Sequence, residues 1–171
     1  MVAFAGGCTY SKQSPTLVLV VAKSVPIHTA RDLEGQTIAV PSTKSLNGEP
    51  FSSDAKAEQR ALGVPFEAMG KPFYVNVYAA SRDWLATNPQ LARRLSTALY
   101  ATARWANTHR PESAAIESRF TKIPLDVAQT MARNVFGTSF EPQLMQPVLD
   151  IAAKFQLTSR TVRAAEIAAP A

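Results

Sequence analysis

The feature that most constrains the fold is the run from Thr16 to Lys23 (TLVLVVAK), in which apolar side chains follow one another almost without interruption. A half-exposed strand alternates apolar and polar residues, so this run is typical of a strand buried on both faces. Residues 30–34 carry helix signals, with Thr29 as a cap and Gly35 as a stop. Residues 37–40 (TIAV) have the β-branched composition of a second strand. This order of elements predicts an α/β fold with a parallel or mixed sheet.

Length and charge limit the classes of protein to consider. A chain of 171 residues with 46% hydrophobic residues suits one domain that buries its own core. The formal charge of +5 is spread along the chain, which mildly favours anions and does not indicate a nucleic-acid-binding protein. No stretch approaches the roughly 20 apolar residues that a membrane-spanning helix needs. Cys8 is the single cysteine, so an internal disulfide is excluded.

Glycine, proline and capping residues predict the elements in the rest of the first half. Residues 1–14 contain Gly6, Gly7 and several polar residues, which is typical of a loop. A helix is expected over residues 54–62, ended by Gly63. A second strong strand is expected over residues 72–80 (PFYVNVYAA), where aromatic and β-branched residues dominate.

From Ser81 onward every signal is helical. Proline in the first turn predicts helices over residues 89–108, 111–120, 124–136 and 142–155, and Pro147 should split the last one. The helical spacing of Leu91, Leu95 and Leu99, with Trp105, predicts a stripe that faces the core. The alanine-rich tail, residues 164–171, is expected to fray.

The loop after residues 37–40 is the candidate binding site. It holds Ser42, Thr43, Ser45, Asn47 and Glu49, and ligands of open α/β sheets usually sit at loops beyond the carboxyl ends of strands. The alternative interpretations are a plain polar turn and an ordinary solvent-exposed glutamate.

Aromatic residues offer a second set of candidates. Tyr10, Tyr74 and Tyr78 are candidates for lining a cleft, with Tyr74 and Tyr78 expected on one face of a strand. Trp84 and Trp105 lie among apolar helical residues and are expected in the core.

Nothing in the sequence indicates catalysis, a cofactor or a metal. His28 and His109 have no metal-ligand partner three or four residues away. Phosphate-binding, dinucleotide and nucleophile-elbow motifs are missing from the sequence. The expected function is therefore recognition.

Four stretches, taken together, resemble a known family. They are LVLVVAKSVPIHTARDLEGQTIAVPS, NGEPF with the following SSDAKAEQRALG, YVNVYAASRDWLATNPQLARRL and ARWANTHRPESAA, and they cover about two thirds of the chain. In this order they resemble the solute-binding proteins of ABC importers for nitrate, sulfonate, taurine and thiamine precursors. The resemblance implies a periplasmic-binding-protein-like (type II) α/β fold, a small-molecule ligand, an ABC permease as partner and a periplasmic location.

The resemblance also implies an incomplete copy of that fold. By this resemblance, the first part of the family's first lobe has no counterpart before Met1, no signal peptide is recognised, and a unit of the family is deleted between Ser45 and Leu46. We therefore expect one partial solute-binding domain, 1–171, with an α/β part (1–80) that contains the mixed sheet and a helical part (81–171). Exposed lobe surface would then favour a homodimer.

By the same resemblance, Ser42, Thr43 and Ser45 match the loop that holds the family's ligand, Glu49 matches the carboxylate near the hinge, and Asn47 is a weaker addition. Two alternatives stay open. One is the effector-binding domain of a transcription regulator, which shares the two-lobed fold, and the other is a vestigial fragment that only binds a partner chain.

Overall fold

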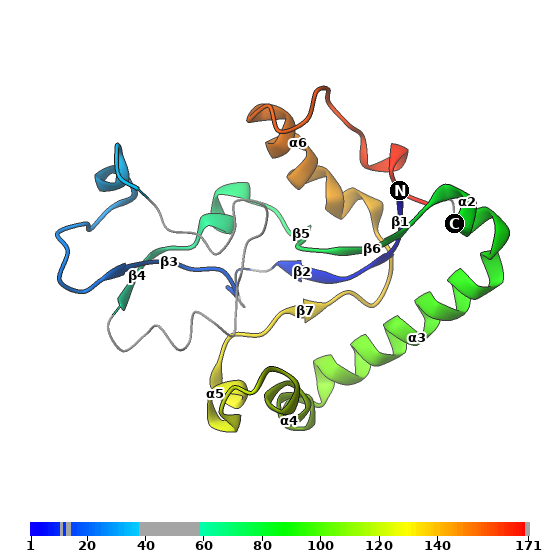
Figure 1. Cartoon of the computed structure of the whole chain (residues 1–171), viewed down its shortest axis with the longest axis horizontal. Coiled ribbons are helices and arrows are strands. Elements are labelled where there is room, and N and C mark those ends of the chain that lie inside the picture. Colours follow the sequence, from blue (N-terminus) through cyan, green and yellow to red (C-terminus); the bar gives the residue numbers. More distant parts are fainter. Residues whose placement is uncertain (11, 13–14, 38–58, 170–171) are drawn as a thin grey trace.

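The computed structural model describes residues 1–10, 12, 15–37 and 59–169. Short strands form its centre, with α3 and α6 on opposite sides of them in the view of Figure 1, and the β3–β4 pair lies away from this centre. The strands are β1 (Val2–Gly6), β2 (Cys8–Tyr10), β3 (Leu19–Ala22), β4 (Gln59–Gly63), β5 (Phe73–Tyr74), β6 (Val77–Ala80) and β7 (Val135–Phe136). The helices are α2 (Arg82–Thr87), α3 (Pro89–Thr108), α4 (Arg110–Thr121), α5 (Leu125–Thr130) and α6 (Gln146–Lys154), with short 3₁₀ turns η1 (Ala30–Leu33), η3 (Pro65–Met69), η4 (Pro142–Met145) and η5 (Ala164–Glu166).

The first residues of the chain form the central strands. β1 pairs antiparallel with β6, and β2 lies between β5 and β7. Val2, Ala3 and Ala5 are buried. The loop predicted for residues 1–14 is therefore wrong over residues 2–10. Small residues such as alanine and glycine carry a weak strand signal, so pairing with distant strands decides their conformation.

The predictions for the next segment need three corrections. The run from Thr16 to Lys23 yields only the short strand β3, whose residues Leu19–Val21 are half-buried, and not a strand buried on both faces. β3 pairs antiparallel with β4, so residues 59–62 form a strand where a helix was predicted. The strand predicted over residues 72–80 is interrupted at Val75 and Asn76, which places β5 and β6 in different sheets.

The other predictions in this segment have mixed outcomes. η1 forms where a short helix was expected, and Gly35 follows it with a φ of +74°. Residues 38–40 of the second predicted strand and residues 54–58 of the predicted helix lie outside the described residues.

Capping residues and first-turn prolines predict the helices of the second half well. α2 begins after Ser81, whose hydroxyl accepts a hydrogen bond from the Trp84 backbone N–H at 3.1 Å. α3 has the predicted bounds, α4 lies within one residue of them, and the last helix divides into η4 and α6 next to Pro147. The helix predicted over residues 124–136 ends early, because α5 stops at Thr130 and residues 135–136 join β2 as β7.

The buried face of α3 is not the predicted one. Leu91, Leu95 and Trp105 are 49%, 42% and 37% exposed, and Leu99 is half-buried, so three of the four stripe residues lie outside the core. The α3 residue that is buried is Ala92. Its other half-buried side chains, mostly small, are Ser96, Leu99, Tyr100, Ala103 and Ala106. This face is turned toward β1 by Tyr100, whose hydroxyl accepts a hydrogen bond from the Gly6 N–H at 3.2 Å.

The alanine-rich tail does not fray over the residues described. Ala164 is buried, the Ala3 N–H donates to the Ile167 carbonyl at 2.7 Å, and the Ala169 N–H donates to the Ala3 carbonyl at 2.7 Å. These bonds attach the tail to the free side of β1, so backbone pairing supplies what the side chains lack.

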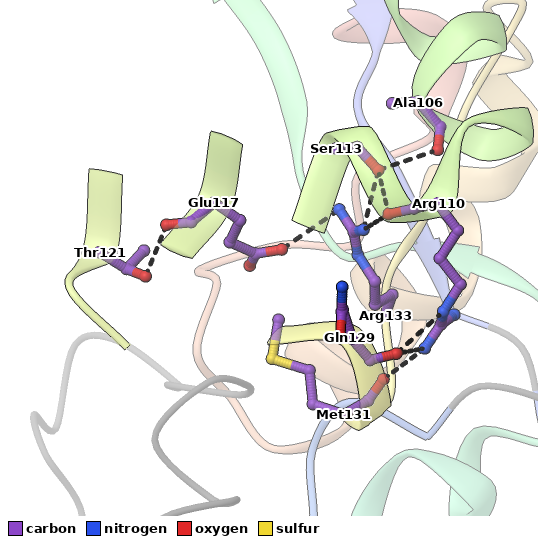
Figure 2. Close-up of polar contacts among 8 residues, drawn as sticks. All are labelled: Ala106, Arg110, Ser113, Glu117, Thr121, Gln129, Met131 and Arg133. Carbon is purple, nitrogen blue, oxygen red and sulfur yellow. Dashed lines mark hydrogen bonds and ion pairs between the residues drawn. The ribbon is translucent and has the colours of Figure 1, made fainter. Parts of the chain in front are cut away.

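Arg133 joins α4 to the segment that follows α5. Its guanidinium pairs with Glu117 at 3.2 Å and donates to the Ser113 hydroxyl at 2.8 Å and the Arg110 carbonyl at 3.2 Å (Figure 2). Arg110 in turn donates to the Met131 carbonyl at 2.7 Å. Arg110 thus satisfies a backbone carbonyl at the end of the short α5, and Arg133 holds the following segment against the start of α4.

The aromatic cluster and the α3 stripe lead to one prediction about stability. Phe73 is 2% exposed and packs on Tyr10 and Phe66, so Phe73→Ala should lower the free energy of unfolding by about 3–5 kcal/mol. Leu95→Ala should lower it by no more than about 1 kcal/mol, because the side chain is already 42% exposed. Urea denaturation of both variants tests this. Equal losses would show that α3 buries its leucines after all.

The Arg133 contacts lead to a second prediction. Arg133→Ala should lower the free energy of unfolding by about 1–3 kcal/mol, since it leaves Glu117 and backbone carbonyls without a charged donor. Arg119→Ala, at an exposed position of α4, is the matched control and should change stability by less than about 0.5 kcal/mol. Thermal melts that rank the two variants together would contradict the structural role of Arg133.

Candidate functional site

The five predicted ligand-binding residues, Ser42, Thr43, Ser45, Asn47 and Glu49, all lie outside the described residues. They stay a prediction.

Hydrogen bonds fix the conformation of the described residues before and after that loop. Asp32 accepts from the backbone N–H groups of His28 at 2.8 Å and Thr29 at 2.9 Å, which lowers the pKa of its carboxyl. Arg60 of β4 donates to the carbonyls of Val25 and Ile27. These bonds hold η1, β4 and the turn after β3 in a defined arrangement.

Among the described residues, a first hollow lies between α3 and a junction of glycines. Gly6, Gly7 and Gly137 meet where β1, β2 and β7 approach one another, and a Cβ on Gly6 would lie 2.5 Å from the Tyr74 hydroxyl. Only glycine permits so close an approach. The α3 hollow, of ≈ 230 Å³, is bounded by this junction, by Tyr78 and Phe136, and by α3 side chains between Leu95 and Ala106. Its described lining carries no charged side chain, so it suits an apolar group.

A second hollow, the Tyr10 hollow, has a volume of ≈ 240 Å³ and a mixed lining. Tyr10 at the end of β2 packs on Phe66 and Phe73 with ring centroids 5.3 Å apart in both cases. Pro65 begins η3 and Gly70 ends it with a φ of +69°, which turns the chain toward Lys71. The hollow is therefore formed where β2, η3 and the turn before β5 meet.

Charged groups line the Tyr10 hollow beside its rings. Lys12, Lys71 and Glu67 are all part of the lining, which gives it a formal charge of +1 by two lysines against one glutamate. Within the part of the chain that the structure describes, none of the three makes an ion pair.

Among the described residues the Tyr10 hydroxyl has no hydrogen-bond partner, although the side chain is only 3% exposed. Burial raises the pKa of the Tyr10 phenol, and the nearby Glu67 carboxylate raises it further. The phenol therefore stays protonated at neutral pH and remains a donor without an acceptor.

The structure separates the three tyrosines predicted to line one cleft. Tyr10 lines the Tyr10 hollow, and Tyr78, 42% exposed, lines the α3 hollow. Tyr74 is 4% exposed, donates to the Ser139 carbonyl and accepts from the Glu141 N–H, both at 3.0 Å. It is a core residue. Trp84 lines a shallow surface hollow, and Trp105 stacks on His109, so neither tryptophan is fully buried as predicted.

Solved structures of two binding proteins are similar to this chain. The periplasmic aliphatic sulphonate binding protein SsuA from Escherichia coli matches with a TM-score of 0.65 and 15% identity, over 99% of this chain and 69% of that chain. The alkanesulfonate-binding protein SsuA from Xanthomonas axonopodis pv. citri, bound to MOPS, matches with a TM-score of 0.58 and 12% identity, over 99% of this chain and 74% of that chain. Neither a protein-family model nor a curated protein sequence matches the chain.

The chain has the fold of a periplasmic binding protein. The predicted fold class is thereby confirmed, although the identities are too low to carry a function. The division into parts 1–80 and 81–171 stays a prediction, and the pairing of β2 with β7 joins strands from both parts.

Sequence reasoning missed most of the Tyr10 hollow. It singled out Tyr10 but not Lys12, Phe66, Glu67 or Lys71, which lie up to 61 positions away in the sequence. The sequence offered one signal, a lysine two positions from an aromatic residue at Tyr10–Lys12 and again at Lys71–Phe73. This signal is weak in isolation.

No group of three or more potential metal-binding side chains occurs among the described residues, and no helix there is long and apolar enough to cross a membrane. Cys8 is half-buried in β2, and burial raises the pKa of its thiol to about 11. A thiol this weakly acidic is a poor nucleophile at neutral pH.

Cys8 therefore leads to a prediction about reactivity. At pH 8 its rate of alkylation by iodoacetamide should be roughly a hundredfold below that of glutathione, because the thiolate fraction is about that much smaller. The rate should keep rising about tenfold per pH unit toward the thiol pKa of about 11. Mass spectrometry of the native protein measures it. A plateau in the rate near pH 9 would contradict the raised pKa.

Proposed function

We propose that the chain is a solute-binding protein of an ABC importer that binds a small organic or anionic ligand and catalyses no reaction. The observation that carries this proposal is the fold, which extends over 99% of the chain in both comparisons and is shared with two proteins that bind sulfonates. The formal charge of +5 supports an anionic ligand, because a positive field raises the local concentration of anions.

Among the ligands bound by the protein family that the sequence resembles, we favour a sulfonate. Both structural neighbours are named for sulfonates, whereas nitrate, taurine and thiamine precursors rest on the sequence resemblance alone. A sulfonate has three oxygens that accept hydrogen bonds, and the hydroxyls of Ser42, Thr43 and Ser45 are suitable donors.

The remaining residues of the loop have different roles in this proposal. Asn47 adds an amide donor, and Glu49 faces a cationic or hydroxyl part of the ligand. A periplasmic location and an ABC permease as partner follow from the same proposal. The internal deletion and the homodimer stay predictions.

A binding experiment on the loop tests the proposed function. Butane-1-sulfonate is titrated calorimetrically into the native chain and into the triple variant S42A/T43A/S45A. The variant should bind at least about tenfold more weakly, because each hydrogen bond to a charged group contributes about 1.5–3 kcal/mol. Thr97→Ala is the control, since this exposed α3 hydroxyl bonds only to the Arg93 carbonyl of its own helix.

Two further results decide the outcome. Glu49→Gln should not weaken binding of the anionic butane-1-sulfonate, because it removes a negative charge. Equal affinity of the triple variant and the Thr97→Ala control would refute the role of the loop. The deletion predicts affinity on the order of millimolar, since a site with one wall buries little of its ligand.

A further inference from the structure

The outer edge of β6 is open in the part of the chain that the structure describes. β6 pairs with β1 on one side, and the two form a sheet of two strands. The opposite side of β1 is covered, because the Ala3 N–H donates to the Ile167 carbonyl and the Ala3 carbonyl accepts from the Ala169 N–H, both at 2.7 Å. The edge of β7 is covered as well, since the Asn107 side chain donates to the Phe136 carbonyl at 2.8 Å and accepts from the Phe136 N–H at 3.0 Å. No described residue covers the outer edge of β6 in a comparable way.

The register of the β1–β6 pair identifies the backbone groups that are open. In an antiparallel pair, residues that exchange hydrogen bonds with the opposite strand alternate with residues whose N–H and C=O point away from it. Ala3 uses both of its groups on the tail, so Ala79 opposite it directs its own N–H and C=O away from β1. The Gly6 N–H donates to the Tyr100 hydroxyl at 3.2 Å, so Val77 opposite Gly6 is oriented in the same way. These four groups of Val77 and Ala79 have no hydrogen-bond partner among the described residues.

The β6 edge also lacks the features by which proteins keep an open edge from pairing. Such edges usually carry charged side chains, a proline or a bulge. The sequence of β6 is VYAA, and the irregularity of this strand pair lies in β1, between Ala3 and Ala5. An open, uncharged edge of this kind favours the addition of a further strand.

Uncharged and mostly apolar side chains lie beside the open edge. Tyr78 of β6 and Leu95 of α3 line both the α3 hollow and the shallow hollow at Trp84, and both are 42% exposed. Neither hollow has a charged side chain in its described lining. The lining therefore has no charge that would select a charged partner, and none that would repel an identical one.

We propose that β6 pairs with β6 of a second copy of the chain, antiparallel across a two-fold axis at Tyr78. In this register Val77 of each copy exchanges both backbone hydrogen bonds with Ala79 of the other copy, so all the open groups are paired. The two sheets become one sheet of four strands, and Tyr78 and Leu95 lie at the interface. The proposal does not depend on the proposed ligand.

The size of the surface sets the expected affinity. A specific interface of standard size buries about 800 Å² on each partner. The open strand, the exposed Tyr78 and Leu95 and the half-buried Phe4 and Trp84 provide roughly half of that area. The dimer should therefore be weaker than an obligate one, with a dissociation constant on the order of 10 µM.

Sedimentation velocity of the full chain between about 1 and 200 µM, a range that brackets this constant, tests the dimer. Ala79→Pro removes an N–H that the monomer leaves unbonded, so it should keep the fold and weaken the dimer by about tenfold or more. Ala79→Ser keeps that N–H and is the matched control, which should change the dissociation constant by less than about twofold.

A second pair of variants tests the side chains beside the edge. Leu95→Glu brings like charges to the interface from both copies and should weaken the dimer by about tenfold or more. Leu157→Glu, at a leucine that is 77% exposed and lines neither hollow, should leave the dissociation constant unchanged. Both variants should melt close to the wild type, because both leucines are exposed.

Cross-linking tests the register. In a Cys8→Ala background, Tyr78→Cys should form a disulfide between two copies on mild oxidation, because residues directly opposed in a non-hydrogen-bonded antiparallel pair have Cα atoms about 4.5 Å apart. Ala61→Cys, at an exposed position of β4, is the control and should not cross-link. Non-reducing gel electrophoresis separates the two outcomes.

Three results would overturn the proposal. They are a monomer at every concentration, equal dissociation constants for each variant and its control, and cross-linking through position 61 in place of position 78. A monomer whose β6 amides nevertheless resist hydrogen exchange would show that a segment of the same chain, and not a second copy, covers the edge. Each of these results leaves the calorimetric test of the proposed function unaffected.

Discussion

The buried phenol of Tyr74 is the contact on which the centre of the molecule depends. Its hydroxyl donates to the Ser139 carbonyl and accepts from the Glu141 N–H, so it connects β5 with the segment between β7 and η4. Gly6 and Gly137 lie directly against it. Any side chain at Gly6 would collide with the hydroxyl, and the turn from β1 to β2 could then not pass so close to β5. The Gly137 N–H also donates to the Gly7 carbonyl at 2.6 Å, which closes the junction.

An element of this fold can be predicted from the sequence when its signal lies in its own residues, and cannot when it depends on a distant partner strand. α3 and the split between η4 and α6 follow from local signals, because proline at the first turn fixes the start of a helix. β1 and β2 have no such signal, since VAFAG and CTY become strands only by pairing with β6, β5 and β7. β4 is a further example. The sequence of Gln59–Gly63 predicts the end of a helix, but pairing with β3 makes it a strand.

The candidate site divides in the same way. Hydroxyl, amide and carboxylate residues adjacent in sequence, such as Ser42 and Glu49, can be recognised as a loop. The Tyr10 hollow joins the end of β2 to a turn about 60 positions later, and only the folded chain brings Tyr10 and Lys71 together. Sequence periodicity also predicted the wrong face of α3, because its leucines and its alanines both recur at helical spacing. The strand junction fixes the face, since the Gly6 N–H donates to the Tyr100 hydroxyl of α3 at 3.2 Å.

The two hollows differ in what they can recognise, and the difference follows from the elements that form them. The α3 hollow is bounded by glycines, by the rings of Tyr78 and Phe136 and by uncharged side chains of α3, so it offers shape and apolar surface but no described charge. Selection between anions and cations requires charge, which η3 and the turn after it supply through Glu67 and Lys71. Helix α3 thus contacts the strand junction through the Tyr100 hydroxyl, and the charged side chains lie at the hollow on the β2 side of that junction.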